Sequence, residues 1–236
     1  MTKLGTFYGI GVGPGDPDLL TVKAIKAIKN VDVIIAPKTE KKDGSVALEI
    51  ARPYLKADVE IIYQVFPMVK DFAESPEIFI SNKEEIIKIL QAKKNVAFLT
   101  LGDPMFYSTY IYIFKLLSEE KINIETIPGV PAFLAIASRI GQPIAFGNEI
   151  LSIIPATADL NKIDEILDKA DTSVLMKVYK NFDQIVDTLE NHNMAWQAKL
   201  VSRCGLPDEK IISDISDHKD DQLNYLSTII TRKSID

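Results

Sequence analysis

Short apolar segments alternate with segments of helical spacing along the first half of the chain, and this alternation constrains the fold more than any other feature. Thr6 to Val12, Val31 to Ala36 and Asn95 to Leu101 have the character of strands. The unbroken apolar run of Val31 to Ala36 is typical of a strand buried on both faces. Strands that alternate with helices predict β-α-β units, so we expect an α/β protein with a parallel sheet covered by helices.

The same alternation predicts the remaining elements and a division of the chain. In the first half we expect strands at Val59 to Val65 and Ile122 to Ile127, and helices at Pro17 to Lys29, Ser45 to Leu55, Asn82 to Lys93 and Pro104 to Glu119. A segment rich in Pro and Gly, with an apolar helix at its centre, follows from Pro128 to Gly147. We therefore expect a parallel domain over 1–128 and a second α/β domain over 129–236.

The second half repeats the rhythm with different connections. We expect strands at Ile150 to Ile154, Ser173 to Val178, Lys199 to Cys204, Lys210 to Ser213 and Ser227 to Thr231, and helices at Asn161 to Lys169 and Phe182 to Asn191. The short connection between the last two strands predicts antiparallel pairs among the late strands. The second domain is therefore expected to contain a mixed sheet.

Composition excludes several classes of protein. The 236 residues are 47% hydrophobic and 25% charged, as in ordinary globular proteins, and no apolar run reaches the roughly 20 residues of a membrane span. Cys204 is the only cysteine, and the start of the chain does not resemble a signal peptide, so we expect a cytoplasmic protein. His192 and His218 lie outside any Cys/His cluster, so no metal site is expected. A net charge of −6 disfavours nucleic acid as a partner.

A glycine-rich turn follows the first expected strand, from Gly9 to Pro17. A dinucleotide-binding G-x-G-x-x-G pattern fails there, because Pro14 or Asp16 stands where the third glycine should be. Asp16 and Pro17 instead fit the cap and the first position of a helix, which puts a carboxylate where a pyrophosphate would bind. This turn alone is a weak signal, since any α/β protein needs tight turns between strands and helices.

A second turn repeats the design after the strand that ends near Leu101. It reads Gly102-Asp103-Pro104, again a glycine, a capping aspartate and a proline. Both turns follow the carboxyl ends of expected parallel strands, and that edge of an open α/β sheet is where ligands bind. Gly102 lets a ligand approach the backbone closely.

The two turns together with Pro128-Gly129-Val130-Pro131-Ala132 resemble the tetrapyrrole methylases in order and spacing over essentially the whole chain. The resemblance implies two αβα domains that bind S-adenosylmethionine in a cleft between them, with S-adenosylhomocysteine as the product. The family's cofactor contacts fall by position on Pro14, Leu101, Gly102, Asp103, Phe106, Ser108, Thr109, Val130, Pro131, Ala132, Met176, Lys177, Arg203 and Cys204. Val130 and Pro131 stand where relatives often have a small hydroxylated residue or alanine, so backbone contacts are expected there.

Finer features resemble the enzymes that methylate C20 of precorrin-2 or cobalt-factor II in cobalamin biosynthesis. The segment Thr100 to Thr109, the stretch Val65 to Met68 and the run Val174 to Val178 fit that group, while uroporphyrinogen methylases carry a further glycine where Leu101 stands. The implied nucleophile is a meso carbon of a reduced tetrapyrrole, activated by its pyrrole nitrogens. A strong catalytic base is then unnecessary, and the candidate for accepting the C20 proton is Tyr107.

Tyr107 is also interpretable as an aromatic on the core face of its helix, in a stripe with Tyr110, Ile111 and Phe114. A substrate with many carboxylates needs basic residues, and the candidates are Lys177, Lys180, Lys38 and Arg139. A single lysine is more often a solvated surface charge, but Lys177 directly follows a strand that the sequence predicts to be buried.

Other functions remain open from the sequence. Within the family these are another corrin position, uroporphyrinogen III, diphthine synthesis or ribosomal RNA 2′-O-methylation, the last disfavoured by the acidic charge balance. Outside it are a non-catalytic ligand-binding α/β protein and an NAD-dependent oxidoreductase. The resemblance also implies a homodimer, and it leaves open whether the tetrapyrrole carries cobalt.

Overall fold

The computed structural model describes residues 4–39, 44–67 and 75–233. Met68, which belongs to one of the stretches noted above, lies outside these residues. The chain divides into two compact units, the first ending at Pro131 and the second beginning at Ala132. The expected α/β class is confirmed, and each unit has its own sheet and its own helices. Within the described residues, no helix combines the length and apolar character needed to cross a membrane.

The sheet of the first unit is parallel throughout and has the strand order β3-β2-β4-β1-β5. Its strands are β1 (Thr6–Gly11), β2 (Val33–Lys38), β3 (Glu60–Val65), β4 (Val96–Thr100) and β5 (Asn123–Ile127). The central strand β4 is buried along its whole length, which explains its continuous apolar sequence.

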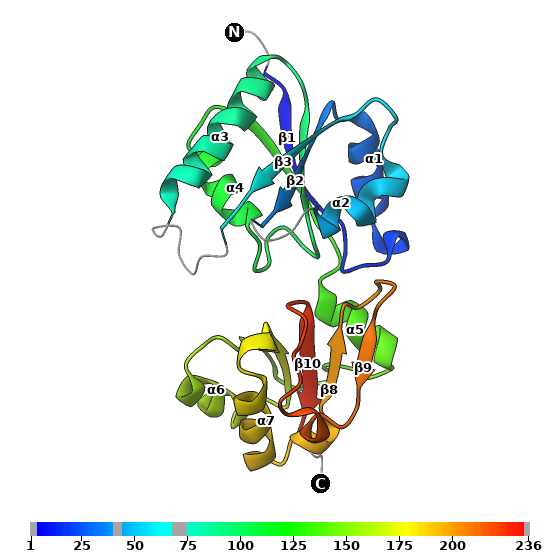
Figure 1. Cartoon of the computed structure of the whole chain (residues 1–236), viewed down its shortest axis with the longest axis vertical. Helices are drawn as coiled ribbons and strands as arrows, with labels where there is room; N and C mark the ends of the chain where they lie inside the picture. Colours follow the sequence, from blue (N-terminus) through cyan, green and yellow to red (C-terminus); the bar gives the residue numbers. More distant parts are fainter. Residues whose placement is uncertain (1–3, 40–43, 68–74, 234–236) are drawn as a thin grey trace. The chain divides into compact units, whose positions relative to one another are not determined.

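Helices cover both faces of this sheet. They are α1 (Val22–Asn30), α2 (Val46–Ala51), α3 (Pro76–Gln91) and α4 (Tyr110–Ser118), with α1 and α2 on one face and α3 and α4 on the other (Figure 1). Phe7, Phe79, Phe98 and Tyr110 fill the space between the sheet and the second pair of helices. Burying each of these side chains contributes about 2 kcal/mol to stability.

Several helix boundaries differ from the expected ones. Asp16 caps only a short 3-10 turn, Pro17–Leu19, and α1 then begins anew with the Thr21 hydroxyl as its cap, accepting from the Ala24 N–H at 3.1 Å. The helix expected from Asn82 begins already at Pro76. The helix expected from Pro104 begins only at Tyr110.

The second unit contains a mixed sheet with the order β6-β7-β10-β8-β9. Its strands are β6 (Leu151–Pro155), β7 (Thr172–Met176), β8 (Lys199–Ser202), β9 (Lys210–Ile212) and β10 (Ser227–Arg232). The strands β6 and β7 are parallel, and β10 lies antiparallel between β7 and β8. The two late strands are antiparallel to β8 on its two sides and are not paired with each other.

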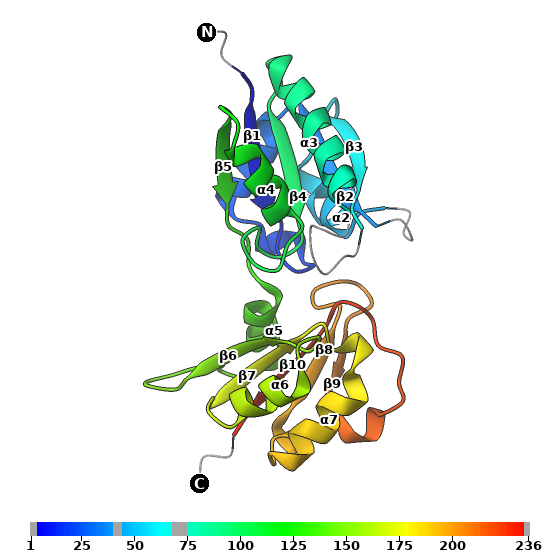
Figure 2. The same ribbon diagram turned by 90° about the vertical axis from the view of Figure 1, so that its left-hand side faces the viewer.

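The helices α6 (Leu160–Leu167) and α7 (Phe182–Asn191) cover one face of the second sheet, as Figure 2 shows. Their apolar residues pack on Leu175, Leu200 and Ile229 of the strands. The helix α5 (Ala132–Ile140) contacts β10, and its buried residues are Phe133 and Ile136. Each sheet thus has a core between its strands and its helices, and the strand ends are left to form loops.

Candidate active site

Three loops of the first unit meet at one edge of its sheet. They follow β1, β4 and β5, which are neighbours in the sheet and run parallel, so their carboxyl ends share an edge. The loops cover residues 12–16, 101–109 and 128–131. They carry all the residues of this unit that the sequence assigned to the cofactor. The structure brings these residues together, although they are far apart in the chain.

Glycine backbones join the three loops directly. The Gly102 N–H donates to the Gly13 carbonyl over 2.8 Å, and the Gly13 N–H donates back to the Gly102 carbonyl over 3.3 Å. A Cβ added to Gly129 would lie only 2.2 Å from the Gly102 oxygen and 2.7 Å from the Gly11 carbonyl carbon. No side chain fits at this crossing, so the loops after β1, β4 and β5 form one closely packed backbone surface.

Gly102 is buried, but its Cβ position is less crowded than those of Gly11 and Gly129. A Cβ built on Gly102 would meet nothing nearer than the Pro131 Cα at 3.9 Å, and the residue has a positive φ of 71°. The hydroxyl of Thr100, the last residue of β4, is buried without a hydrogen-bond partner among the described residues. Glycine at this position keeps the loop after β4 free of a side chain, so a ligand at this edge could approach the neighbouring backbone closely.

The Asp103 carboxylate stabilises the loop after β4 by accepting two backbone hydrogen bonds. Its Oδ1 accepts a hydrogen bond from the Met105 N–H at 2.8 Å, and its Oδ2 accepts one from the Gly129 N–H at 3.0 Å. The first bond caps a single turn, and the second reaches the loop after β5. Asp103 thus holds two of the three loops together.

Tyr107 lies in an irregular segment between Asp103 and α4, and not in the helix. One turn begins at Asp103, where the Phe106 N–H donates to the Asp103 carbonyl, but Tyr107 then adopts a left-handed conformation with φ of 47° and ends it. Tyr107 is 46% exposed and precedes the helix, so its assignment to a core face of that helix is wrong. Tyr110 does belong to the core, where its hydroxyl bonds to the Thr126 hydroxyl.

Phe106, Ser108 and Thr109 lie in the same irregular segment. The Phe106 ring packs against the Tyr107 ring, with 4.6 Å between centroids. The Ser108 hydroxyl donates to the Pro104 carbonyl, so it stabilises the segment from within. The left-handed Tyr107 had no signal in the sequence, since such positions normally call for Gly, Asn or Asp.

A second group of assigned residues lies at one edge of the sheet in the second unit. The strand β8 is antiparallel to β10, which is antiparallel to β7, so the carboxyl ends of β6, β7 and β8 share that edge. Met176 ends β7, Lys177 follows it, and Arg203 and Cys204 follow β8. Lys177 and Arg203 both adopt positive φ, 62° and 56°.

The electrostatics of these residues differ. Burial lowers the pKa of Lys177, because desolvation disfavours the ammonium form. The Arg203 Nε is paired with Asp208 at 2.6 Å, and the Arg139 Nε with Glu209 at 2.8 Å. Burial, and then the neighbouring Glu209 carboxylate, raise the pKa of Cys204 to about 11, so this thiol remains protonated at neutral pH. Lys177 is therefore a basic residue whose charged form is disfavoured by its surroundings.

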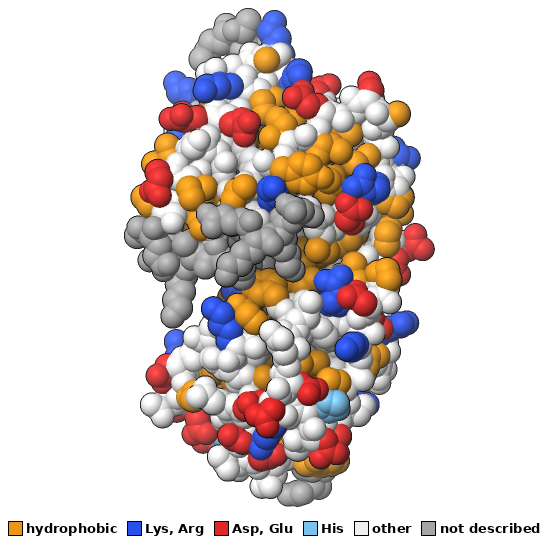
Figure 3. All heavy atoms as spheres, viewed as in Figure 1, with side chains coloured by type: hydrophobic (Ala, Val, Ile, Leu, Met, Phe, Trp, Pro, Cys, Tyr) orange, Lys and Arg blue, Asp and Glu red, His pale blue; other side chains and the backbone are white. Residues whose placement is uncertain are grey.

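The other two basic candidates are more peripheral. Lys38 ends β2, and its ammonium lies 5.9 Å from the ring centroid of Tyr63 on the edge strand β3. Figure 3 looks onto this edge of the first unit, where apolar side chains gather. Lys180 is exposed, with its ammonium 5.7 Å from the Tyr179 ring. Both positions suit a charge at the rim of a site.

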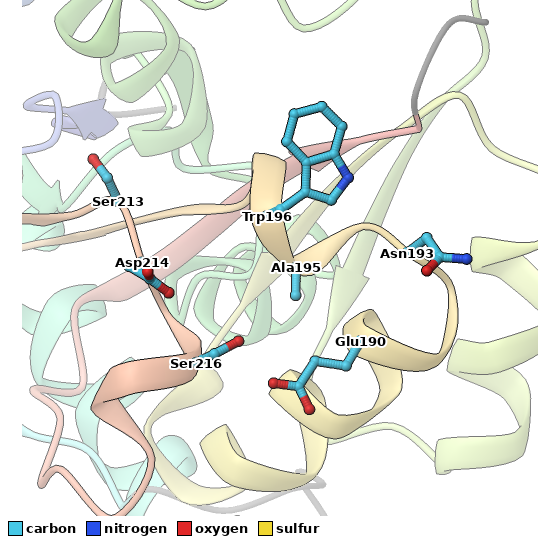
Figure 4. A pocket seen from close by; sticks show the side chains of 7 residues that line it. All are labelled: Glu190, Asn193, Ala195, Trp196, Ser213, Asp214 and Ser216. Atoms are coloured by element: carbon cyan, nitrogen blue, oxygen red, sulfur yellow. The ribbon is translucent and has the colours of Figure 1, made fainter.

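Two pockets are lined by residues other than those assigned to the cofactor or the substrate. One, of about 360 Å³, is lined by Glu190, Asn193, Ala195, Trp196, Ser213, Asp214 and Ser216 (Figure 4). Trp196 precedes β8 and Ser213 follows β9, so this pocket lies at the opposite end of β8 from Arg203. The other, of about 550 Å³, lies between β3 and α3 beside Tyr63 and Glu85. Within the described residues, no group of His, Cys, Asp and Glu side chains is arranged to hold a metal ion.

Two solved structures with a similar fold bear the names of tetrapyrrole methyltransferases. A cobalt precorrin-4 methyltransferase has a TM-score of 0.74 and 21% identity, covering 96% of this chain and 94% of that chain. A uroporphyrin-III C-methyltransferase from Thermus thermophilus, complexed with S-adenyl homocysteine, has a TM-score of 0.70 and 20% identity, covering 97% and 92%. At these identities the likeness establishes the fold.

Sequence comparison then defines the family. The model of the tetrapyrrole (corrin/porphyrin) methylases matches residues 6–217. The cobalt-precorrin-2 C(20)-methyltransferase of Salmonella typhimurium is 35% identical over 97% of both chains. A probable cobalt-precorrin-2 C(20)-methyltransferase of Methanocaldococcus jannaschii is 36% identical over 96% of this chain and 95% of the relative. The chain belongs to the tetrapyrrole methylase family, which confirms the resemblance drawn from the glycine turns.

Proposed function

We propose that this protein is an S-adenosylmethionine-dependent methyltransferase that adds a methyl group to C20 of cobalt-factor II or precorrin-2 in cobalamin biosynthesis. The observation that carries the proposal is the meeting of Gly11, Gly102 and Gly129 at the carboxyl ends of β1, β4 and β5, the edge at which open parallel sheets bind ligands. It is supported by the near full-length similarity to relatives named for cobalt-precorrin-2 C20 methylation.

The residues of the first unit fit a nucleoside ligand. Pro14, Leu101, Gly102, Val130 and Pro131 lie on the same three loops, and Leu101, Val130 and Pro131 are partly exposed there. We propose that the cofactor binds here, largely through backbone groups, and also contacts Ala132, Met176, Lys177, Arg203 and Cys204. When bound, S-adenosylmethionine supplies an electrophilic methyl group on its sulfonium.

For the chemical step, the protein must hold the meso carbon and the methyl group close and in line. The substrate nitrogens supply the electron density, so the protein residues mainly bind, orient and exclude water. Tyr107 is proposed to assist loss of the C20 proton, since its side chain is 46% exposed in the loop after Asp103. Lys177, Lys180, Lys38 and Arg139 are proposed to meet the carboxylates of the tetrapyrrole.

We further propose that the two compact units are the functional domains, that the protein assembles as a homodimer, and that it works in the cytoplasm without nucleic acid, membrane or bound metal. Phe146 and Ile150 support the dimer, because they are 61% and 60% exposed in the segment before β6. Large apolar side chains that gather at a surface often mark an interface.

The test is calorimetric titration with S-adenosylhomocysteine, followed by turnover on cobalt-factor II and on metal-free precorrin-2 under anaerobic conditions. Binding with one methyl group added at C20 is the expected result, and the preferred substrate identifies the route. Binding without turnover on either tetrapyrrole would move the substrate elsewhere in the family. Failure to bind S-adenosylhomocysteine would contradict the methyltransferase assignment itself.

A further inference from the structure

Asp16 and Asp103 occupy the same local motif in two different loops. Each stands between a glycine and a proline, after β1 and after β4 respectively. The Asp16 Oδ1 accepts from the N–H two residues on at 2.9 Å, and the Asp103 Oδ1 does the same at 2.8 Å. Capping a turn therefore requires only one carboxylate oxygen in each case.

The second oxygen distinguishes the two residues. The Asp103 Oδ2 accepts from the N–H of Gly129, which lies 26 residues further along the chain in the loop after β5. Asp16 is exposed, and its bond stays within its own turn. One of two similar aspartates thus links separate loops, and it is the one that follows Gly102.

The partner of this bond lies close against the backbone of the other two loops. The Gly129 nitrogen would lie 2.5 Å from a Cβ at Gly11, and the Gly129 Cα 2.7 Å from it. A hydrogen bond from a backbone N–H to a carboxylate is charge-assisted and stronger than a neutral one. The Asp103–Gly129 bond therefore fixes where the loop after β5 lies against Gly11 and Gly102.

We propose that Asp103 is a positioning residue of the cofactor site: its carboxylate ties the loop after β4 to the loop after β5, and acts on the ligand through the backbone of Gly102 and Gly129. Each oxygen already accepts a backbone N–H group, which orients the carboxylate toward the two loops. This inference rests on the proposed function only for the identity of the ligand.

The experiment compares two ligands and two aspartates. Asp103→Ala is titrated with S-adenosylhomocysteine and with 5′-methylthioadenosine, which lacks the charged amino-acid part. We expect the dissociation constants of both ligands to rise by the same factor, about tenfold or more. Asp16→Ala removes an equivalent cap without the link and should change either constant by less than about twofold. Asp103→Asn keeps one acceptor oxygen and should fall between Asp103→Ala and the wild type.

A measurement without ligand tests the link itself. In protein labelled with ¹⁵N-glycine, the Gly129 N–H should exchange with solvent slowly in the wild type and in Asp16→Ala, and much faster in Asp103→Ala. This readout still tests the link if the wild type binds no S-adenosylhomocysteine, an outcome that would count against the proposed function alone.

Two results would overturn the inference. If Asp103→Ala weakens S-adenosylhomocysteine but not 5′-methylthioadenosine, the carboxylate contacts the amino-acid part of the ligand directly. If the exchange of the Gly129 N–H is the same in Asp103→Ala and in the wild type, the bond does not hold the two loops together.

Discussion

Three of the residues assigned to binding or catalysis lie in left-handed backbone conformations although they carry full side chains. Tyr107, Lys177 and Arg203 have φ values of 47°, 62° and 56°. Such a conformation costs a non-glycine residue about 1–2 kcal/mol, and strain of this kind gathers at functional sites. All three follow the carboxyl end of a strand, at the edges to which the sequence assigns the ligand.

Lys177 is the residue at which binding should be most sensitive to substitution. Lys177→Ala should raise the tetrapyrrole dissociation constant about tenfold or more, because a charge-assisted contact to a substrate carboxylate is lost. The free energy of unfolding should change by less than about 1 kcal/mol, since alanine meets the same backbone strain. Fluorescence titration with the tetrapyrrole and urea unfolding measure the two quantities.

The pH dependence of binding follows from the lowered pKa of Lys177. As pH rises through that lowered pKa, the ammonium is lost and the affinity for a polycarboxylate falls. Lys177→Ala should abolish this part of the pH dependence, whereas Lys162→Ala, an exposed lysine on α6, should leave it intact. An unchanged pH profile in Lys177→Ala would limit Lys177 to a structural role.

At the scale of elements, the alternation of apolar and helical segments predicts the strands well, because strands buried on both faces have continuous apolar sequences. The helix starts were harder. Asp103-Pro104 carries every local signal of a helix start, yet the helix begins at Tyr110, because the turn that Asp103 caps ends at Tyr107. The helix α3 begins at Pro76, with Ser75 as its N-terminal cap. The sequence pattern predicts a helix only from Asn82, where charged residues follow.

The candidate site was predictable as a set of loops but not as a set of contacts. Parallel strands bring Gly13, Gly102 and Gly129 to one edge, which spacing in the sequence indicates. That Gly11 and Gly129 touch, or that Asp103 bonds to Gly129, depends on the strand order β4-β1-β5, which no local pattern encodes.

Because the loops approach closely at Gly11, we expect substitution of Gly11 to reduce stability and binding more than substitution of Gly141, where nothing lies near the Cβ position. In Gly11→Ala the new Cβ would lie 2.5 Å from the Gly129 nitrogen and 2.6 Å from the Gly102 oxygen. Because backbone must move, we expect a loss of about 1–3 kcal/mol in the free energy of unfolding and weaker S-adenosylhomocysteine binding. Urea unfolding and calorimetric titration provide the two measurements.

Gly141→Ala is the matched control. Gly141 has a φ of 65°, but nothing lies within 4 Å of its Cβ position, so only backbone strain is added. It should cost about 1 kcal/mol and leave binding unchanged. Equal effects of the two substitutions on binding would mean that the close approach at Gly11 does not shape the site.

At the scale of the whole molecule, the segment 141–150 before β6 extends away from the sheet of its own unit (Figure 2). Its base is firmly attached: the Arg232 guanidinium pairs with Glu149 and lies 5.6 Å from the centroid of the Phe146 ring. The Phe146 N–H donates to Glu149 at 3.1 Å. A held segment that exposes Phe146 and Ile150 is suited to contact another protein surface.

A second copy of this chain is the proposed partner of that segment. Each chain carries a net charge of −6, so two copies repel except where their contacting surfaces are neutral. The only ionisable side chain in 141–150 is Glu149, and Arg232 neutralises it. This is the kind of surface through which two acidic chains can associate.

The corresponding prediction concerns Phe146. Sedimentation equilibrium at micromolar concentration should give the wild type twice the chain mass of 26.3 kDa, and Phe146→Ser should shift the population toward single chains. Trp196→Ser is the control, because Trp196 is slightly more exposed than Phe146, at 67%, but lies beside the pocket before β8. A monomeric wild type would exclude the dimer. A dimer that Phe146→Ser leaves intact would instead place its interface on another surface, with the apolar edge around β3 as the next to test by substitution at Tyr63.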